Sequence, residues 1–131
     1  MGITGVGKRN VFQVMQTDRT VLSIYVHPSS LQEDKIAPGN FIRFVENRDG
    51  NPDVLLALRS QAARNGQFPN AMGYALQFEQ AGWQIAGVAA LQGASFDRLT
   101  NNAPQPVPIP GSKTMPANEI ASIIRDPWNW L

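Results

Sequence analysis

Cysteine is absent from the 131 residues of this chain. Its absence excludes disulfide bridges, thiolate metal sites and cysteine nucleophiles. Histidine is almost absent as well, because His27 is its single occurrence. A chain of this length corresponds to one domain, which is large enough to bury a core without covalent crosslinks.

Charged side chains are scarce. Lys, Arg, Asp and Glu make up 16% of the sequence, against roughly 25% in ordinary soluble domains. The 11 basic and 10 acidic residues leave a net charge of +1, which gives no electrostatic surface for nucleic acid or an anionic membrane. The chain instead has 10 Gln and 10 Asn, and only three Lys. This composition indicates a surface that neighbouring subunits cover, since charge is depleted at the cores of interfaces.

Long apolar runs are also missing, so no segment has the length needed to span a bilayer. Residues 1–9 are Gly-rich and basic and lack the apolar stretch of a secretory signal peptide. We expect these residues to form a flexible lead. We also expect the protein to stay in the compartment where it is made.

Two short motifs for phosphate and calcium are incomplete. Residues 2–8 match the G-x-x-x-x-G-K of a P-loop, but Arg9 stands where Ser or Thr should hold magnesium. Oxygen-bearing side chains alternate over residues 47–53 as in a calcium loop, but Pro52 occupies the glycine position and no bidentate Glu follows. We therefore predict no cofactor and no metal ion.

No catalytic constellation is apparent, and we do not expect an enzyme. A nucleophilic serine needs a histidine held against it by the fold. Ser29 and Ser30 follow His27 closely, but neighbouring positions on an extended chain point apart, so the sequence predicts no dyad. Glu33 and Asp34 are interpreted as carboxylates of a surface loop.

Two strands are predicted near the start of the chain. Residues 11–15 and 20–26 are rich in β-branched and aromatic side chains, and residues 18–19 between them favour a turn. Pro28 is expected to end the second strand, because it has no N–H to donate to a ladder.

A third strand is predicted over residues 41–45, after a reverse turn at residues 38–39. Ser30 and Glu33 have the spacing of a capping box, which favours a helical turn over residues 31–36. The strongest helix signal follows at residues 52–65, where an Asn precedes a Pro at the first helical position.

A β-hairpin is predicted over residues 72–91, because apolar side chains recur at every second position and Gly82 suits the turn. For residues 83–91 a helix fits almost as well as a strand. Together the predicted elements indicate a β-rich α+β fold with a mostly antiparallel sheet and one capped helix, in a core domain over residues 10–100.

The composition changes at Asn101, and residues 101–131 form a separate tail. Five prolines within residues 101–116 predict an extended spacer. A short helix is expected after Pro116, followed by two tryptophans. The tail either docks on a neighbouring subunit or folds back on its own domain, and the length of the spacer favours the neighbour. The residues predicted to bind a partner are the apolar ones at this end: Ile120, Ile123, Ile124, Trp128, Trp130 and Leu131.

Residues 21–31, a strand that ends in Pro-Ser-Ser-Leu, resemble the opening of small tail and baseplate proteins of tailed bacteriophages. His27 stands where such proteins more often carry Asn. The resemblance implies a structural role in a virion, or a cytoplasmic subunit before assembly, and it transfers no catalytic residue.

The leading prediction is therefore a structural subunit that interlocks with other subunits of one assembly through its tail. The alternative is a small binding module for a peptide, a glycan or a single-stranded nucleic acid. Its surface would be a set of rings flanked by two arginines: Phe41, Phe44, Tyr74, Phe78 and Trp83, with Arg43 and Arg48.

Overall fold

The structure is a computed structural model that describes residues 11–48, 52–61, 68–91 and 98–130. The lead at residues 1–9 lies outside these ranges. The elements are, in chain order, β1 (Val11–Met15), β2 (Val21–Ser30), α1 (Pro38–Glu46), β3 (Asp53–Ala57), α2 (Ala71–Gln80), β4 (Ala89–Leu91), β5 (Val107–Ile109), the 3-10 turn η3 (Ser112–Thr114) and α3 (Ala117–Arg125).

Within the described ranges, the main sheet has three strands in the order β1-β2-β3. β1 pairs with β2 in antiparallel orientation, whereas β3 pairs with β2 in parallel orientation. The prediction of a mostly antiparallel sheet is therefore wrong. The reason is the connection through α1, because a crossover helix returns the chain in the direction of the strand that it left. Helices and strands do combine in one fold, as the sequence predicts.

The first two strands lie where the sequence places them. Val11 pairs with Tyr25 and Met15 with Val21. The turn at residues 18–19 is also confirmed, with Arg19 at a φ of 73°. The Asp18 side chain accepts a hydrogen bond from the Thr20 N–H at 2.9 Å, which closes the turn.

Pro28 does not end β2, which runs on to Ser30. The register with β3 shifts between His27 and Ser30, where the partners are Leu56 and Ala57. This irregularity accommodates the missing N–H of the proline, as a β-bulge does. The prediction that the strand stops at Pro28 is wrong for that reason.

Residues 38–46 form the helix α1, so the predicted turn at Pro38-Gly39 and the predicted strand at 41–45 are both wrong. Pro38 opens the helix, a position in which its missing N–H costs nothing. Pro38, Phe41 and Val45 are its buried residues. Their spacing follows the helical period rather than the alternation of a strand.

The helix predicted at 52–65 is also wrong, because Asp53–Ala57 is the strand β3. Residues 62–65 lie outside the described ranges. Val54, Leu55 and Leu56 form a short apolar run that suits either element. Parallel pairing with β2 stabilises the strand, in which Val54 pairs with Tyr25 and Leu55 with Val26.

Residues 71–80 form the helix α2 and not the first arm of a hairpin. The Asn70 side chain caps it by accepting a hydrogen bond from the Gly73 N–H at 2.9 Å. Its buried residues lie at i, i+3, i+4 and i+7: Ala71, Tyr74, Ala75 and Phe78. Gly82 has a φ of 91°, as predicted, but it ends the turn after the helix instead of closing a hairpin.

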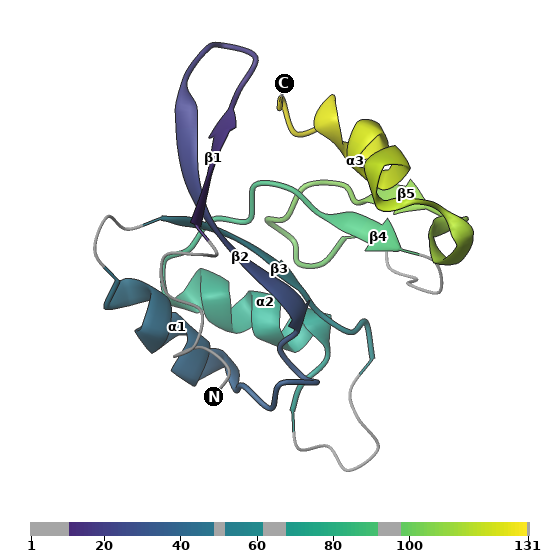
Figure 1. The fold of residues 1–131 in the computed structure, drawn as a ribbon. Helices are drawn as coiled ribbons and strands as arrows, with labels where there is room; N and C mark the ends of the chain where they lie inside the picture. Colours follow the sequence, from purple (N-terminus) through teal and green to yellow (C-terminus); the bar gives the residue numbers. More distant parts are fainter. Residues whose placement is uncertain (1–10, 49–51, 62–67, 92–97, 131) are drawn as a thin grey trace.

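The second arm of the predicted hairpin is a strand only at Ala89–Leu91. This strand, β4, pairs in parallel with β5, which lies in the Pro-rich segment. β4, β5 and α3 form a second group of elements, seen to the right in Figure 1.

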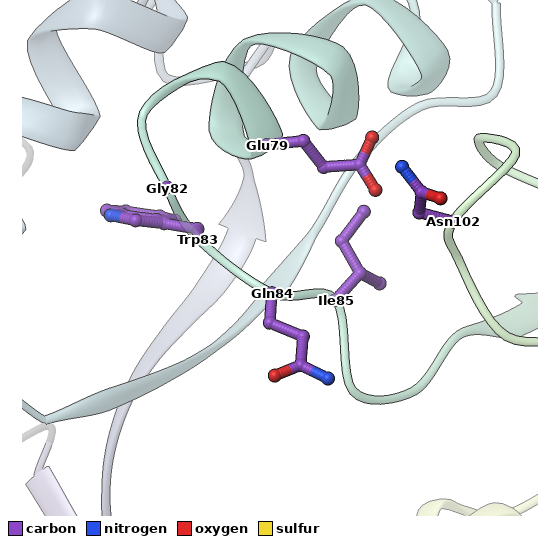
Figure 2. Close-up of a pocket in the computed structure, with 6 residues that line it drawn as sticks. All are labelled: Glu79, Gly82, Trp83, Gln84, Ile85 and Asn102. Atoms are coloured by element: carbon purple, nitrogen blue, oxygen red, sulfur yellow. The ribbon is translucent and has the colours of Figure 1, made fainter.

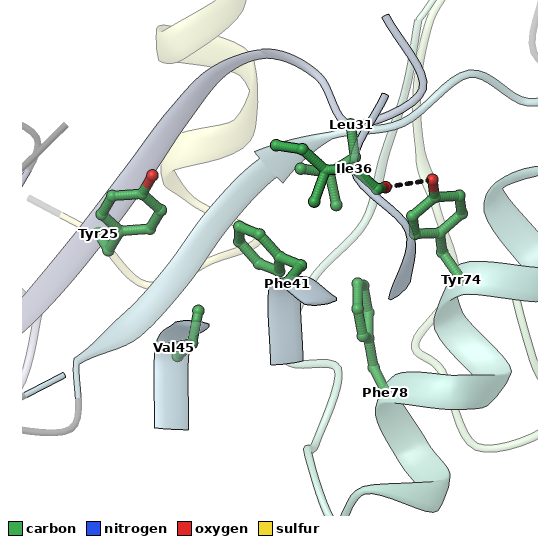
Figure 3. Packing of buried hydrophobic residues seen from close by; sticks show 7 residues of the cluster. All are labelled: Tyr25, Leu31, Ile36, Phe41, Val45, Tyr74 and Phe78. Carbon is green, nitrogen blue, oxygen red and sulfur yellow. Dashed lines mark hydrogen bonds between the residues drawn. The ribbon is translucent and has the colours of Figure 1, made fainter. Parts of the chain in front are cut away.

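The main core lies between the three-stranded sheet and the two helices α1 and α2 (Figure 1). Aromatic side chains from three elements meet there, as Figure 3 shows. The Tyr74 hydroxyl, which is buried, donates a hydrogen bond of 2.6 Å to the Ile36 carbonyl (Figure 3). The buried members of this core are Tyr25, Leu31, Ile36, Phe41, Val45, Tyr74 and Phe78.

Candidate functional site

The C-terminal helix α3 begins after Pro116 and ends at Arg125, as the sequence predicts. Its chain direction then changes in a tight turn, in which the Trp128 N–H donates to the Ile124 carbonyl and the Trp130 N–H to the Arg125 carbonyl. Asn129 takes a φ of 57° in that turn, a conformation that asparagine adopts more readily than most residues. The two tryptophans are thereby held close together, with ring centroids 5.2 Å apart.

Trp128 lies directly against Gly87. A Cβ atom on Gly87 would lie 2.6 Å from Nε1 and 2.8 Å from Cε2 of the Trp128 indole. Side chains do not approach so closely, so only glycine leaves room for the ring. We call this space the Gly87 notch. It receives the tail because residue 87 has no side chain.

The last described residues lie beside the turn of the β1–β2 hairpin. The Thr17 N–H donates a hydrogen bond of 2.9 Å to the Asn129 carbonyl. Gln16 and Trp130 form an isolated antiparallel bridge. The end of the chain therefore joins the strand pair at the start of the described chain (Figure 1).

The predicted partner-binding residues lie in or next to this arrangement. Ile120 and Ile124 are half-buried on α3, and Ile123 is 37% exposed. Leu131 lies outside the described residues. The structure shows the tail on its own chain, and docking on a neighbour stays a prediction.

Docking of the tail leaves one polar atom without a partner. Trp128 Nε1 is buried and makes no hydrogen bond to any residue that the structure describes. An unsatisfied buried donor costs about 1–3 kcal/mol. Burial of the indole therefore stabilises the docked tail less than it would if the N–H had a hydrogen-bond acceptor.

His27 belongs to a hydrogen-bonded group that joins β2 to the turn after it. Its Nε2 lies 2.6 Å from Asp34 Oδ2, and its Nδ1 lies 3.3 Å from the Tyr25 hydroxyl. The Ser29 hydroxyl donates to the same Asp34 oxygen at 2.6 Å. Ser29 therefore bonds to the carboxylate and not to the imidazole, and both ring nitrogens already have partners.

The electrostatics of this group favour an ionised Asp34. The hydrogen bond from Ser29 is the main cause that lowers the pKa of Asp34, and His27 lowers it further. Burial raises the pKa of Tyr25, so its hydroxyl keeps its proton. The sequence does not predict the role of Asp34. The spacing of Ser30 and Glu33 does predict a turn there, in which the Glu33 N–H donates to Ser30 Oγ at 3.1 Å.

The rings predicted as a stacking surface are mostly core. Phe41, Tyr74 and Phe78 are buried, and Trp83 stacks on Phe78 with centroids 5.0 Å apart. Rings that fill a core offer no face to a ligand. Arg48 instead lies over the Tyr25 ring, with its guanidinium carbon 5.4 Å from the centroid.

A cavity of about 210 Å³ lies beside the end of α2. Figure 2 shows the side chains of Glu79, Ile85 and Asn102 close together, whereas those of Trp83 and Gln84 point away. The Thr100 hydroxyl donates to Glu79 at 2.7 Å. The cavity is smaller than the roughly 300–1,000 Å³ of typical small-molecule sites.

Within the described ranges, no three His, Asp or Glu side chains lie together so that they could hold a metal ion. Two members of the calcium-like pattern, Asp49 and Asn51, fall outside those ranges. The helices that the structure describes include none with the length and apolar character to cross a membrane.

The resemblance to phage tail proteins, predicted from residues 21–31, stays a prediction. The structure shows these residues as β2 and the start of the following turn. Comparisons of the chain with protein-family models, with curated proteins and with solved structures find no match in any of the three.

Proposed function

We propose that this protein is a structural subunit of a larger assembly, and that the β1–β2 hairpin and the C-terminal tail form its contact surface. The observation that carries the proposal is the hairpin, which projects from the rest of the sheet (Figure 1). Three large apolar side chains on it face solvent: Phe12, Met15 and Val21 are 52%, 45% and 53% exposed.

Met15 and Val21 are direct cross-strand partners, so their side chains stand on the same face of the hairpin. Phe12 stands on the opposite face, because its position along β1 differs by an odd number of residues from that of Met15. Full burial of side chains of this size stabilises an interface by about 1.5–3 kcal/mol each. A hairpin with apolar side chains on both faces fits a place between neighbouring subunits.

The edge of the sheet supports the same proposal. Among the described strands β1 lies at the edge, and its sequence Val-Phe-Gln-Val-Met contains no Lys or Pro to block pairing with another chain. The low content of charged residues points in the same direction. We propose specifically that the assembly is a virion, and this part of the proposal rests on the resemblance of residues 21–31 to phage tail proteins.

The test is the mass of the native protein, isolated from the cells that make it and measured by native mass spectrometry. We expect a complex of several chains. The double variant Met15→Ser/Val21→Ser should release the folded monomer, because it removes the apolar pair. Glu46→Gln, a change at an exposed position of α1 outside the proposed contact surface, is the control and should leave the complex intact. A native protein that is monomeric would refute the proposed function.

A small binding module is the second candidate, and the cavity beside α2 is the observation in its favour. Glu79 offers a carboxylate and Asn102 an amide across the apolar side chain of Ile85 (Figure 2). Such a mixture suits a small polar group of a peptide or a glycan. Chemical-shift changes confined to Ile85 and Asn102 on addition of a ligand would favour this candidate.

A further inference from the structure

We propose that residues 117–130 exchange between two copies of this chain, so that each copy's tail occupies the Gly87 notch and the hairpin turn of the other. The inference rests on the proposed function and names the neighbour: a second copy. α3 contacts β5, and the tip of the tail makes further contacts with distant parts of the described chain. These include the indole of Trp128 on Gly87, the hydrogen bond from Thr17 to Asn129, and the bridge of Gln16 with Trp130.

A second copy is the partner that fits, because the receiving surface is already shaped for this tail. The Trp128 ring occupies the position that a Cβ atom on residue 87 would take, so the space for the ring exists because residue 87 is glycine. A tail from another copy presents the same indole and the same Asn129 carbonyl to the same groups. The two contacts of an exchanged pair are then equal, as in a closed two-fold dimer.

The connection to the tail is built as a hinge. Residues 110–116 have a proline at each end and contain Gly111 and the turn η3. The Thr114 N–H donates to the Gly111 carbonyl and the Met115 N–H to the Ser112 carbonyl, both within this segment. These local bonds form equally well in the closed and the exchanged arrangement, so a few backbone angles suffice to redirect the tail.

The docked tail has features that favour its release and its capture by another copy. Its indole N–H is buried and has no hydrogen-bond partner among the described residues, which weakens docking on the same chain and so populates the open form. Ile123 on α3 and the pair Met15 and Val21 on the hairpin are exposed in the closed form. Exchange brings two copies of these apolar side chains into one complex, where the two chains can bury them against each other.

The absence of cysteine from the chain makes a direct test available. Gln16 and Trp130 face each other in an antiparallel bridge, a spacing of roughly 4.5–5.5 Å between Cα atoms that a disulfide spans. The single variants Gln16→Cys and Trp130→Cys, mixed in equal amounts and oxidised, can join only between chains. We expect a covalent dimer in which one chain of each variant is present, seen by non-reducing electrophoresis and mass spectrometry.

The control mixture pairs Gln16→Cys with Ser122→Cys, whose position lies on the exposed face of α3. It should give at least tenfold less dimer, which measures random collision. The double variant Gln16→Cys/Trp130→Cys reports how much of the disulfide forms within one chain and how much forms between two chains. A purely intramolecular disulfide in the double variant, with no dimer above control in the mixture, would overturn the exchange.

A second measurement needs no substitution. Unlabelled and ¹⁵N-labelled copies of the wild-type chain are mixed and followed by native mass spectrometry. Dimers of intermediate mass that grow in over time support exchange, and a sample that stays monomeric contradicts it. If the native complex is large but the mixture gives no crosslink, the proposed function stands and the exchange falls. If the crosslink and the mixed dimers form but the native complex is no larger than a dimer, the exchange stands and the proposal of a larger assembly falls.

Discussion

At the scale of single residues, Gly87 fixes where the tail can lie. The Trp128 ring occupies the position that a side chain on residue 87 would fill. We predict that Gly87→Ala destabilises the docked tail by about 1–3 kcal/mol, the usual cost of overpacking. Tryptophan fluorescence should shift to the red as the two indoles become solvated.

Gly111→Ala is the matched control, because a Cβ atom at residue 111 would meet Met115 at the ordinary contact distance of 3.8 Å. It should keep the wild-type emission. An unchanged emission spectrum in Gly87→Ala would show that the ring does not depend on this glycine.

A second residue-scale prediction concerns Asp34. Its pKa in the folded chain is lower than the usual value of 3.8, chiefly because Ser29 donates a hydrogen bond to the carboxylate. A lowered folded pKa means that the group contributes stability above its unfolded pKa, and that this contribution is lost as the pH falls through the folded pKa. Asp34→Asn should therefore cost about 1 kcal/mol near neutral pH, and progressively less on acidification below the unfolded value.

Urea unfolding at about pH 7 and about pH 2.5 measures this difference directly. Glu119→Gln, at an exposed position of α3, is the control and should follow the wild-type curve at both pH values. A constant difference between Asp34→Asn and wild type across the pH range would contradict the assignment.

At the scale of secondary-structure elements, α2 depends on its cap. The Asn70 side chain accepts the hydrogen bond of the Gly73 N–H, and the helix carries Tyr74 and Phe78 into the core. We predict that Asn70→Ala lowers the free energy of unfolding by about 1 kcal/mol, the usual cost of a lost N-cap. Asn70→Ser keeps an acceptor oxygen and should recover most of the loss. Chemical denaturation of the three proteins tests this, and equal midpoints would refute it.

The elements also show what the sequence could and could not predict. β1 and β2 were predictable because their pairing is local and one short turn sets its register. α2 was mistaken for a strand because Met72, Tyr74, Leu76 and Phe78 satisfy both periods: alternate positions, and also two pairs spaced by four. Tyr74 and Phe78 are buried whereas Met72 and Leu76 are exposed, a division that only the helical period produces.

β3 was missed for a different reason. Pro52 and the residue before it carry the signals of a helix start. The strand forms because Val54 and Leu55 pair in parallel with β2. The local sequence does not indicate a pairing strand that is separated from it by a crossover helix. In the candidate site, Pro116 and the Ile spacing revealed α3, but the place where Trp128 docks depends on a glycine from a distant part of the chain.

At the scale of the whole molecule, the protein has one core between sheet and helices and a second apolar group around α2 and the loop before β5. Ala71, Ala75, Leu99 and Ala103 form that second group. Ala103 and Ile109 are buried although they lie in the part of the sequence interpreted as tail. The segment after residue 100 thus contributes to the packed body before it reaches the hinge.

The bridge between Gln16 and Trp130 also has a consequence for the order of synthesis. It connects the first described strand with the last described residues, and a ribosome makes the chain from the N-terminus onward. There is therefore an interval in which the hairpin has been made and residues 128–130, which contact it, have not. During that interval the hairpin turn and the Gly87 notch are available to the tail of any finished copy nearby, so chains translated side by side from one message are well placed to meet as they form.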